Sequence, residues 1–459
     1  MPHSILVKDA LIETFDGRST TLKGGYLYTE GGKFVAVGKK EQVMPVAAHP
    51  EFSIDGRGKL VMPGFVNTHV HLAQSLLRGL VPDDVKLMEW LTKWVWPIQA
   101  SFTGYDGVLS ARLALAEMIR AGTTAFVATS INGRYDPDGV ARAVLDSGMR
   151  AALGRQVMDV PGYATKGSVI PEGLVEDPER SLSSFRQLHK RWDGQEGRIW
   201  IWLSPRSPGA CTDELYGRLA EHLHEYDAGV TMHLAEVRDD LKFFNERGTT
   251  PSSFLRSHRL LKPKAIYVHC VWITVRDMMD MARAGCSVSH NPSSNMKLGS
   301  GIAPVSSMIE HGVNVTLGTD GGPSNDSYDL IREAKVATLL QKVANLDPSA
   351  FSFSQALEAA ISNGYRALGI DGTAGKIREG YDADFIVLDL RRPHLIPSLG
   401  HLSNLVYSAC GSDVRDVVVG GQPLMMDGKL LTLDEEEILD RSEEEAAKIL
   451  ERAGLVPSS

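Results

Sequence analysis

The sequence predicts an α/β protein made of a (β/α)8 TIM barrel and a small β-sandwich domain formed by both termini. Between about residues 60 and 370, short apolar runs rich in β-branched residues alternate with amphipathic helical patterns, which is typical of a parallel sheet built from βα units. Eight such runs are present, and a stretch of about 310 residues fits this barrel, whose usual size is about 250 residues before insertions. Both ends of the chain instead contain short strand-like segments separated by Gly and Asp turns.

The eight candidate barrel strands, in chain order, are LVMPGFVNTHVH, TTAFVATS, RAALGRQVMD, RIWIWLSP, AGVTMHLAE, KAIYVHC, GCSVSHNP and NVTLGTDG. Amphipathic segments lie between them. In DELYGRLAEHLHEYD, Leu215, Leu219 and Leu223 recur every four residues, which places them on one face of a helix. The segment TVRDMMDMARAG begins at Thr274, a good capping residue, and ends at Gly285.

The terminal strands are predicted to pair with each other, because neither end is long enough for a β domain of its own. SILVKDALIETF and GGYLYTEGGKFVAVGK lie at the start, and GKIREGYDADFIVLDL and VRDVVVGGQPLMMDGKLLT lie near the end. A polar helix follows in EEEILDRSEEEAAKILERAGL, with Ile438, Ile449 and Leu450 as its packing residues. The predicted boundaries are 1–58 for the N-terminal part of the sandwich, 59–374 for the barrel, and 375–459 for the C-terminal part with the helix.

Composition narrows the class of protein and its partners. The chain has 459 residues, 43% of them hydrophobic, with a formal charge of -9; we therefore expect a globular protein with a large core and no basic surface for nucleic acid. No apolar run reaches the ~20 residues of a membrane span, and the first residues do not resemble a signal peptide. The four cysteines lack CxxC spacing, which favours a reducing, cytoplasmic location. The expected partner is a small molecule.

The segment GFVNTHVHLAQSLLRG carries His69 and His71 one residue apart at the end of a predicted strand. Side chains at i and i+2 of a strand share a face, so both imidazoles can hold one metal ion. Alone, the pair fits two polar residues on a solvated strand face equally well. In a barrel, however, active sites lie at the carboxyl ends of the strands. His233, His269 and Asp320 also end predicted strands, and five such side chains in one ring predict a metal site.

Imidazole and carboxylate groups suit a divalent ion such as zinc or ferrous iron, with one coordination position left for water. Such an ion makes the bound water acidic enough to act as a nucleophile. Glu236 follows His233 by three residues in HLAE and is expected to shuttle the proton. His269 and Asp320 are expected to orient the nucleophile or to help deprotonate it.

The motifs PGFVNTHVH, HLAE, VHC, SHNPSSNMKLGSGIAP and LGTDGGPSND, in this order, resemble the amidohydrolase superfamily in its branch of cytosine deaminase-like aminohydrolases. Within that branch, the sequence is similar to the group of methylthioadenosine/S-adenosylhomocysteine deaminases and s-triazine hydrolases such as atrazine chlorohydrolase. The resemblance covers nearly the whole chain. It implies one divalent ion, zinc before iron, a general acid/base and a residue that polarises the substrate or the water. By residue, these are the ligands His69, His71, His233 and Asp320, the acid/base Glu236 and the polarising His269.

Substrate contacts are expected from the loops at the same end of the barrel. Trp90, Trp94 and Trp96 can stack on a flat heterocycle or simply pack at the barrel rim. Gln74 is expected to face the substrate, as a similarly placed Gln does in the triazine group. The remaining candidates are polar or imidazole side chains near the ends of the last two strands: His290, Asn295, Ser324 and Asn325.

One position departs from the adenosyl deaminases, which carry a histidine after the fourth strand in a PHAPYT-like stretch. This chain reads SPRSPGACT and has Arg206 there, a permanent cation with a longer reach. Arg206 is expected either to bind a carboxylate, phosphate or carbonyl of the substrate or to pair with an acid at the rim. The departure leaves room for a heterocycle other than adenosine.

The predicted function is a metal-dependent hydrolytic deaminase of an aromatic N-heterocycle, such as an adenosine-type nucleoside or a related purine or pyrimidine. One alternative is an s-triazine hydrolase that removes chloride or an amino group by the same addition and elimination. Another is a non-catalytic barrel that only binds a ligand, which has no need for the six polar groups listed above. We also expect a homo-oligomer.

Overall fold

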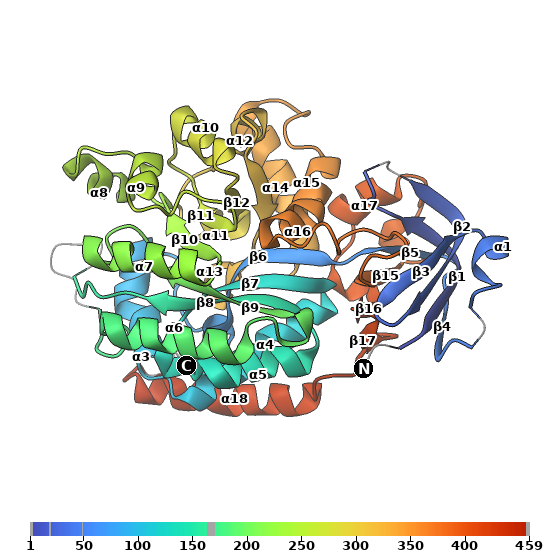
Figure 1. Cartoon of the computed structure of the whole chain (residues 1–459), viewed down its shortest axis with the longest axis horizontal. Coiled ribbons are helices and arrows are strands. Elements are labelled where there is room, and N and C mark those ends of the chain that lie inside the picture. The colour runs from blue at the N-terminus through green and yellow to red at the C-terminus, as the bar shows by residue number, and fades with distance from the viewer. Residues whose placement is uncertain (1–2, 18–19, 48, 163–169, 456–459) are drawn as a thin grey trace.

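The computed structural model describes residues 3–17, 20–47, 49–162 and 170–455 (Figure 1). Two nine-stranded sheets organise the chain. One sheet closes into a barrel surrounded by helices, and the other lies at one end of the barrel and contains strands from both ends of the chain. Among the described helices, none is both long enough and apolar enough to cross a membrane.

The barrel is closed by pairing between its first and last strands, as predicted. Its order is β13-β12-β11-β10-β9-β8-β7-β6-β14, and β14 pairs in parallel with β6 through Asp320 and Val70. Every strand pair in this sheet is parallel. The strands are β6 (Phe65–His71), β7 (Thr123–Ile131), β8 (Arg150–Val157), β9 (Ile199–Pro205), β10 (Val230–Leu234), β11 (Ala265–His269), β12 (Ser287–His290), β13 (Asn314–Leu317) and β14 (Asp320–Gly321).

The first predicted strand is in fact two strands that belong to different sheets. β5 (Lys59–Pro63) pairs with strands of the terminal sheet, and β6 begins after Gly64. A Cβ on Gly64 would lie 2.1 Å from the Thr124 side chain, so only glycine allows this close passage between the sheets. Because side chains alternate along a strand, Leu60 and Met62 pack into the barrel core while Val61 packs into the core of the terminal sheet.

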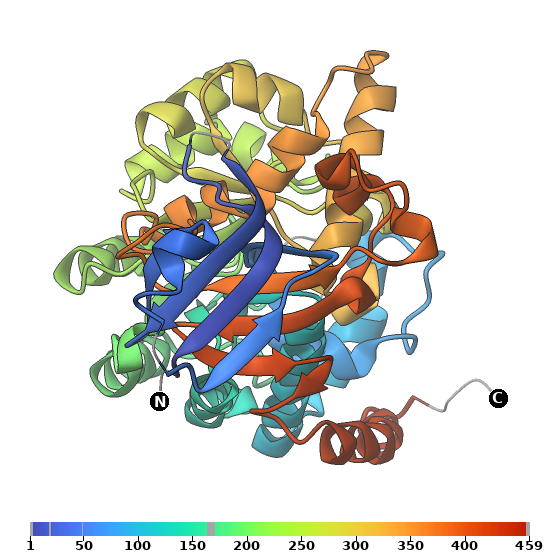
Figure 2. The ribbon, with the colours of Figure 1, turned by 90° about the vertical axis from the view of Figure 1, so that its right-hand side faces the viewer.

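The terminal strands pair into one β-structure with a shared core, which Figure 2 shows in front of the barrel. Ile5 and Val7 from the start of the chain and Phe385 and Val387 from its last quarter are all buried in this core. The strands are β1 (Ile5–Glu13), β2 (Thr21–Glu30), β3 (Lys33–Gly38), β4 (Phe52–Asp55), β5, β15 (Phe385–Asp389), β16 (Val414–Val419), β17 (Gln422–Met426) and β18 (Lys429–Leu430).

The helices predicted from periodicity form close to their expected bounds. α7 begins after Thr212, whose side chain accepts from the Leu215 N–H, and α10 begins after Thr274, which caps it through Asp277. The helices are α1 (Lys40–Val43), α2 (Leu87–Trp90), α3 (Trp96–Ala100), α4 (Gly104–Arg120), α5 (Pro137–Ser147), α6 (Pro178–Trp192), α7 (Asp213–Glu225), α8 (Asp240–Glu246), α9 (Pro251–Ser257), α10 (Val275–Arg283), α11 (Pro292–Lys297), α12 (Val305–Glu310), α13 (Gly322–Asn325), α14 (Leu330–Asn345), α15 (Phe353–Ala360), α16 (Ser362–Leu368), α17 (His401–Tyr407) and α18 (Glu435–Arg452). Shorter turns are η1 (Leu72–Leu77), η2 (Leu91–Val95), η3 (Gly133–Tyr135), η4 (Gln195–Gly197), η5 (Pro393–Leu395) and η6 (Gly411–Asp413).

The terminal helix α18 packs along the barrel helices α4 and α3 (Figure 1). Ile438, Ile449 and Leu450 are buried, as predicted for its packing face. The Arg452 guanidinium lies 2.7 Å from the buried Asp106 carboxylate near the start of α4. The helix that follows the terminal sheet in sequence is therefore attached to the barrel in space.

Candidate metal centre and active site

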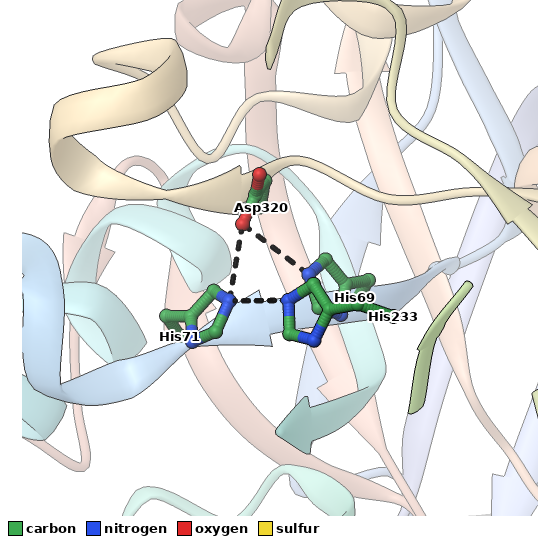
Figure 3. Close-up of side chains that lie close together, drawn as sticks. All are labelled: His69, His71, His233 and Asp320. Carbon is green, nitrogen blue, oxygen red and sulfur yellow. Dashed lines mark hydrogen bonds and ion pairs between the residues drawn. The ribbon is translucent and has the colours of Figure 1, made fainter. Parts of the chain in front are cut away.

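Three histidines and one aspartate converge at the carboxyl ends of barrel strands (Figure 3). His69 and His71 come from β6, His233 from β10 and Asp320 from β14. One nitrogen or oxygen of each side chain lies within 4.8 Å of those of the other three, and all four residues are buried. The parallel closed sheet brings these residues together, because it places the carboxyl ends of all its strands at one rim.

The Asp320 carboxylate lies close to two of the three histidines. Its Oδ1 atom lies 3.2 Å from Nε2 of His69 and 3.2 Å from Nε2 of His71. Nε2 of His71 is also 3.2 Å from Nε2 of His233. Ring nitrogens and a carboxylate oxygen thus face one common point.

The protonation states suit a cation at that point. Burial lowers the pKa of His69 to about 3 and lowers the pKa values of His71 and His233 as well. Burial alone would raise the pKa of Asp320, but the adjacent His69 and His71 side chains outweigh this and hold it well below its usual range. At neutral pH the cluster therefore presents three neutral imidazoles and one carboxylate, the forms that bind metal ions.

Neighbouring groups orient the candidate ligands. The His233 Nδ1–H donates to the Arg206 backbone carbonyl at 2.7 Å, which leaves the Nε2 lone pair facing the cluster. The Ser294 hydroxyl donates to Asp320 Oδ2 at 2.6 Å, so that Oδ1 faces His69 and His71. Tyr328 donates its hydroxyl to the His71 carbonyl at 3.2 Å. Outer contacts of this kind are typical of metal sites, where they fix the tautomer and the orientation of each ligand.

A divalent metal ion fits this donor set. The His69 ring is fully buried, and its Nε2 atom has no hydrogen-bond partner within the described part of the chain, although Asp320 lies 3.2 Å away. A buried polar atom without a partner is costly, and a cation at the common point would give this nitrogen its partner. Three imidazoles and a carboxylate form the nitrogen and oxygen set that zinc accepts.

Glu236 and His269 lie beside the four candidate ligands. Oε2 of Glu236 is 3.7 Å from Nε2 of His269, and Oδ2 of Asp320 is 3.9 Å from the same nitrogen. The His269 Nδ1–H donates to Oδ1 of Asn295 at 2.9 Å, which directs Nε2 toward Glu236 and Asp320. Burial raises the pKa of Glu236 to about 7. Near neutral pH this carboxyl group can therefore both accept and donate a proton.

A small cavity, partly open to solvent, opens onto these groups. Three of the expected substrate contacts, Gln74, Trp90 and Arg206, line it. Sequence reasoning did not single out the other lining residues outside the cluster, which are Leu87, Met88, Leu91, Ser207, Asp240 and Leu298. Nothing in the sequence distinguishes these leucines and Met88 from the many apolar residues that only pack in the core.

Arg206 contributes an unpaired positive charge to the cavity. Its guanidinium lies over the Trp96 ring, 5.4 Å from the ring centre, and no carboxylate within the described ranges lies within 4.0 Å of it. Within the described ranges, therefore, Arg206 forms no ion pair with a rim acid, and its role stays a prediction. Trp96 is buried beneath Arg206, Trp94 is only partly buried, and of the three tryptophans Trp90 is the one that lines the cavity.

The other expected substrate contacts, His290, Asn295, Ser324 and Asn325, are not among the described residues that line this cavity. His290 ends β12, fully buried, and neither of its ring nitrogens has a hydrogen-bond partner in the described chain. Asn295 supports His269 from behind. Asn325 donates to the Thr319 carbonyl at 2.8 Å and to Glu333 at 3.0 Å, which links the loop after β14 to α14.

A closed barrel with such a cluster at its carboxyl rim, next to a proton-exchanging carboxyl group, defines a metal-dependent hydrolase. The chain matches the model of the Amidohydrolase family over residues 60–424, and it belongs to that family. It is thus a hydrolytic enzyme that acts on C–N bonds, as expected, and the reading as a non-catalytic barrel is set aside.

Relatives match nearly the whole chain. A 5'-deoxyadenosine deaminase of Methanosarcina mazei is 37% identical over 450 residues, which cover 98% of this chain and 99% of the relative. A 5-methylthioadenosine/S-adenosylhomocysteine deaminase of Syntrophomonas wolfei is 37% identical over 452 residues, with 97% and 99% covered. The resemblance found in the sequence motifs is thereby confirmed.

Solved structures share the fold. The crystal structure of an adenosine deaminase from Xanthomonas campestris with bound zinc has a TM-score of 0.89 at 27% identity, covering 98% of this chain and 99% of that one. An atrazine chlorohydrolase from Arthrobacter aurescens complexed with zinc has a TM-score of 0.88 at 24% identity, with 96% and 100% covered. The second likeness shows the fold alone.

Proposed function

We propose that this enzyme is a metal-dependent deaminase of adenine nucleosides modified at the 5' position. It would replace the exocyclic amino group of the adenine ring by oxygen and release ammonia. The observation that carries this proposal is the cavity in which Glu236, with its pKa of about 7, adjoins the cluster of three histidines and Asp320. Full-length relatives named as deaminases of 5'-deoxyadenosine and of 5-methylthioadenosine/S-adenosylhomocysteine support this substrate class.

The proposed cofactor is one divalent ion per chain, zinc before iron, held by His69, His71, His233 and Asp320. The nitrogen and oxygen donors support this assignment, and zinc is bound in the solved structure of the related adenosine deaminase. When bound, the ion supplies the positive charge that makes water acidic enough to react at neutral pH.

Glu236 is the proposed proton shuttle. It takes one proton from the attacking water and passes it to the ring nitrogen next to the carbon under attack. The second proton of the water then moves to the amino group, the C–N bond breaks, and the carbon keeps the new oxygen. His269, held by Asn295 at 2.9 Å and adjacent to the Glu236 carboxyl group, orients the nucleophile.

The substrate ring is proposed to lie between Trp90 and the polar groups of the cavity. Trp90 offers an aromatic face, Gln74 offers an amide, and the Arg206 guanidinium offers unpaired donors. His290 and Asn325 are not among the residues that line the cavity, so their proposed contribution is support of the loops rather than contact.

The test is a substrate panel followed by ammonia release and by identification of the product. Purified enzyme loaded with zinc is offered 5'-deoxyadenosine, methylthioadenosine, S-adenosylhomocysteine, guanine, cytosine and aminotriazines. We expect turnover of the adenine nucleosides to inosine-type products, and none by the metal-stripped enzyme. Turnover confined to the triazines would select the alternative function, and equal rates with and without metal would refute the proposed chemistry.

We also propose that the enzyme is a cytoplasmic homo-oligomer. All four cysteines are free thiols, which fits a reducing compartment. On α14 and directly after it, the apolar side chains of Leu339, Val343 and Leu346 are 45%, 71% and 92% exposed, as expected for a surface that contacts another subunit. Light scattering of the purified protein measures the number of chains.

A further inference from the structure

A second group of metal-binding side chains lies outside the active site. It consists of His394 in η5, Cys410 just before η6, and Asp413 in η6. One donor atom from each lies within 4.8 Å of the other two. The two turns are joined by the segment that contains α17, which packs against α15 and α14 (Figure 1). The fold of this segment therefore brings His394 next to Cys410 and Asp413.

Asp413 is the organising residue of this group. Its Oδ2 atom lies 2.9 Å from Nε2 of His394 and 3.7 Å from Sγ of Cys410. The same oxygen accepts the Cys410 backbone N–H at 3.0 Å, which holds the carboxylate in place. The Asp413 side chain is buried (4% exposed), whereas that of His394 is 45% exposed. The group thus has a fixed carboxylate at its base and an imidazole that solvent can reach.

Cys410 differs from the other three cysteines. Cys211, Cys270 and Cys286 are buried, and burial raises the pKa of each of their thiols. Cys410 is only partly buried, and its sulfur lies 3.1 Å from the Ser412 hydroxyl. That hydroxyl can donate a hydrogen bond to a thiolate. Of the four thiols, Cys410 is therefore the one with both access to solvent and donor groups beside it.

We propose that Cys410, His394 and Asp413 bind a second divalent ion of the zinc type, separate from the active-site metal. Thiolate, imidazole and carboxylate are all zinc ligands, and three protein ligands leave the fourth position of a tetrahedral site to water. Binding forms bonds to Sγ, Nε2 and Oδ2. The thiol proton is released to solvent. The single proton of the neutral imidazole moves from Nε2, where it bonds to Asp413, to Nδ1, so one proton leaves for each ion bound.

The ion would connect η5 to η6 and so stabilise this corner of the protein. Next to Cys410, the Gly411 N–H donates to Asp329 Oδ2 at 2.8 Å, and Asp329 caps the start of α14. Since a ligand that binds the folded state alone stabilises it, the ion should raise the melting temperature. This inference does not depend on the proposed substrate.

The test uses cobalt(II), because a cobalt ion bound to a thiolate gives a charge-transfer band in the near ultraviolet that nitrogen and oxygen ligands do not give. The active-site cluster contains no sulfur, so this band reports on Cys410. The full chain, kept reduced, is titrated with cobalt(II) and its bound metal is counted. We expect two ions per chain and the band in the wild type.

Cys410→Ser and His394→Gln should each lower the count to one ion, and Cys410→Ser should abolish the band. Cys286→Ser is the matched control, since it removes a buried thiol whose only described bond is to the Lys262 carbonyl; it should keep both the band and the count. Absence of the band in the wild type, or its persistence in Cys410→Ser, would overturn the proposal. His394→Gln keeps the test decisive if Cys410→Ser folds poorly.

Discussion

Replacing Glu236 by Gln tests the proposed proton shuttle with little change in shape. The backbone at this position is held independently of the side chain, because the N–H groups of Glu236 and Val237 donate to Asp240 Oδ2 at 2.8 and 3.2 Å. Gln has the same length as Glu, so the amide should occupy the position of the carboxyl group. The substitution therefore removes proton transfer while it leaves the proposed metal ligands untouched.

The expected loss follows from the role of a general acid and base, which contributes a rate factor of about 100 to 10,000. That factor corresponds to about 2.7 to 5.4 kcal/mol of activation free energy. Because the pKa of Glu236 is raised to about 7 by burial, kcat/KM of the wild type should fall as the pH drops below about 7, where the base becomes protonated. A bound cation moves this acid limb to lower pH. The residual activity of Glu236→Gln should lack the limb.

The assay compares kcat/KM, its pH profile and the bound metal of Glu236→Gln with those of Asp239→Asn. Asp239 is a suitable control because it is an exposed acid three residues away whose only ion pair among the described residues is with Lys242, at 3.0 Å. We expect full metal content in both variants and a rate loss only in Glu236→Gln. A rate within a factor of about three of the wild type, or a proportional loss of metal, would refute the shuttle role.

Three further predictions concern the metal, the substrate and the pH dependence of stability. His69→Ala and His71→Ala should each lower bound zinc and abolish turnover together; full metal content in both, measured by elemental analysis, would sink the ligand assignment. Arg206→Ala should lower kcat/KM about 10- to 100-fold for substrates with a carboxylate or carbonyl within its reach, the cost of about 1.5 to 3 kcal/mol for hydrogen bonds to a charged group. Arg206→His should shift preference toward adenine nucleosides without a carboxylate, such as methylthioadenosine, and an unchanged substrate ranking in both variants would make Arg206 structural. Burial raises the pKa of Glu333 to about 7, so its contribution to stability is full below the unfolded pKa of about 4.5 and is lost as the pH rises through 7. Between about pH 5 and pH 8, the free energy of unfolding of Glu333→Gln, measured with urea, should therefore rise by up to ~3 kcal/mol relative to that of the wild type. A difference between the two proteins that does not change with pH would contradict the sign.

Local patterns in the sequence were sufficient for the barrel and for the chemical identity of the cluster. Alternation along a strand puts His69 and His71 on one face whatever the rest of the chain does. His233 and Asp320 follow strand-like runs, and in a closed parallel sheet the ends of all the strands meet at one rim. These inferences need only periodicity and chain order, so they could be made from the residues themselves.

Contacts between distant segments could not be read in the same way. The hydrogen bond that His269 donates to Asn295 and the one that His233 donates to the Arg206 carbonyl depend on how loops pack once the barrel has closed. Asn295 was expected to contact the substrate, because a polar residue near a strand end looks the same in sequence whether it faces a cavity or supports a neighbour. Likewise, the lack of an ion pair between Arg206 and the described acids is a property of packing rather than of composition.

The sequence by itself therefore determined which residues form the cluster, whereas tertiary structure decided what each one contacts. The periods of strands and helices are set by local backbone geometry, so they do not depend on distant partners. The assignment of β5 to the terminal sheet and the packing of α18 on α4 instead depend on which apolar surfaces meet. Several surfaces of similar hydrophobicity compete for each face, and burial is non-directional, so only the complete packed structure selects among them.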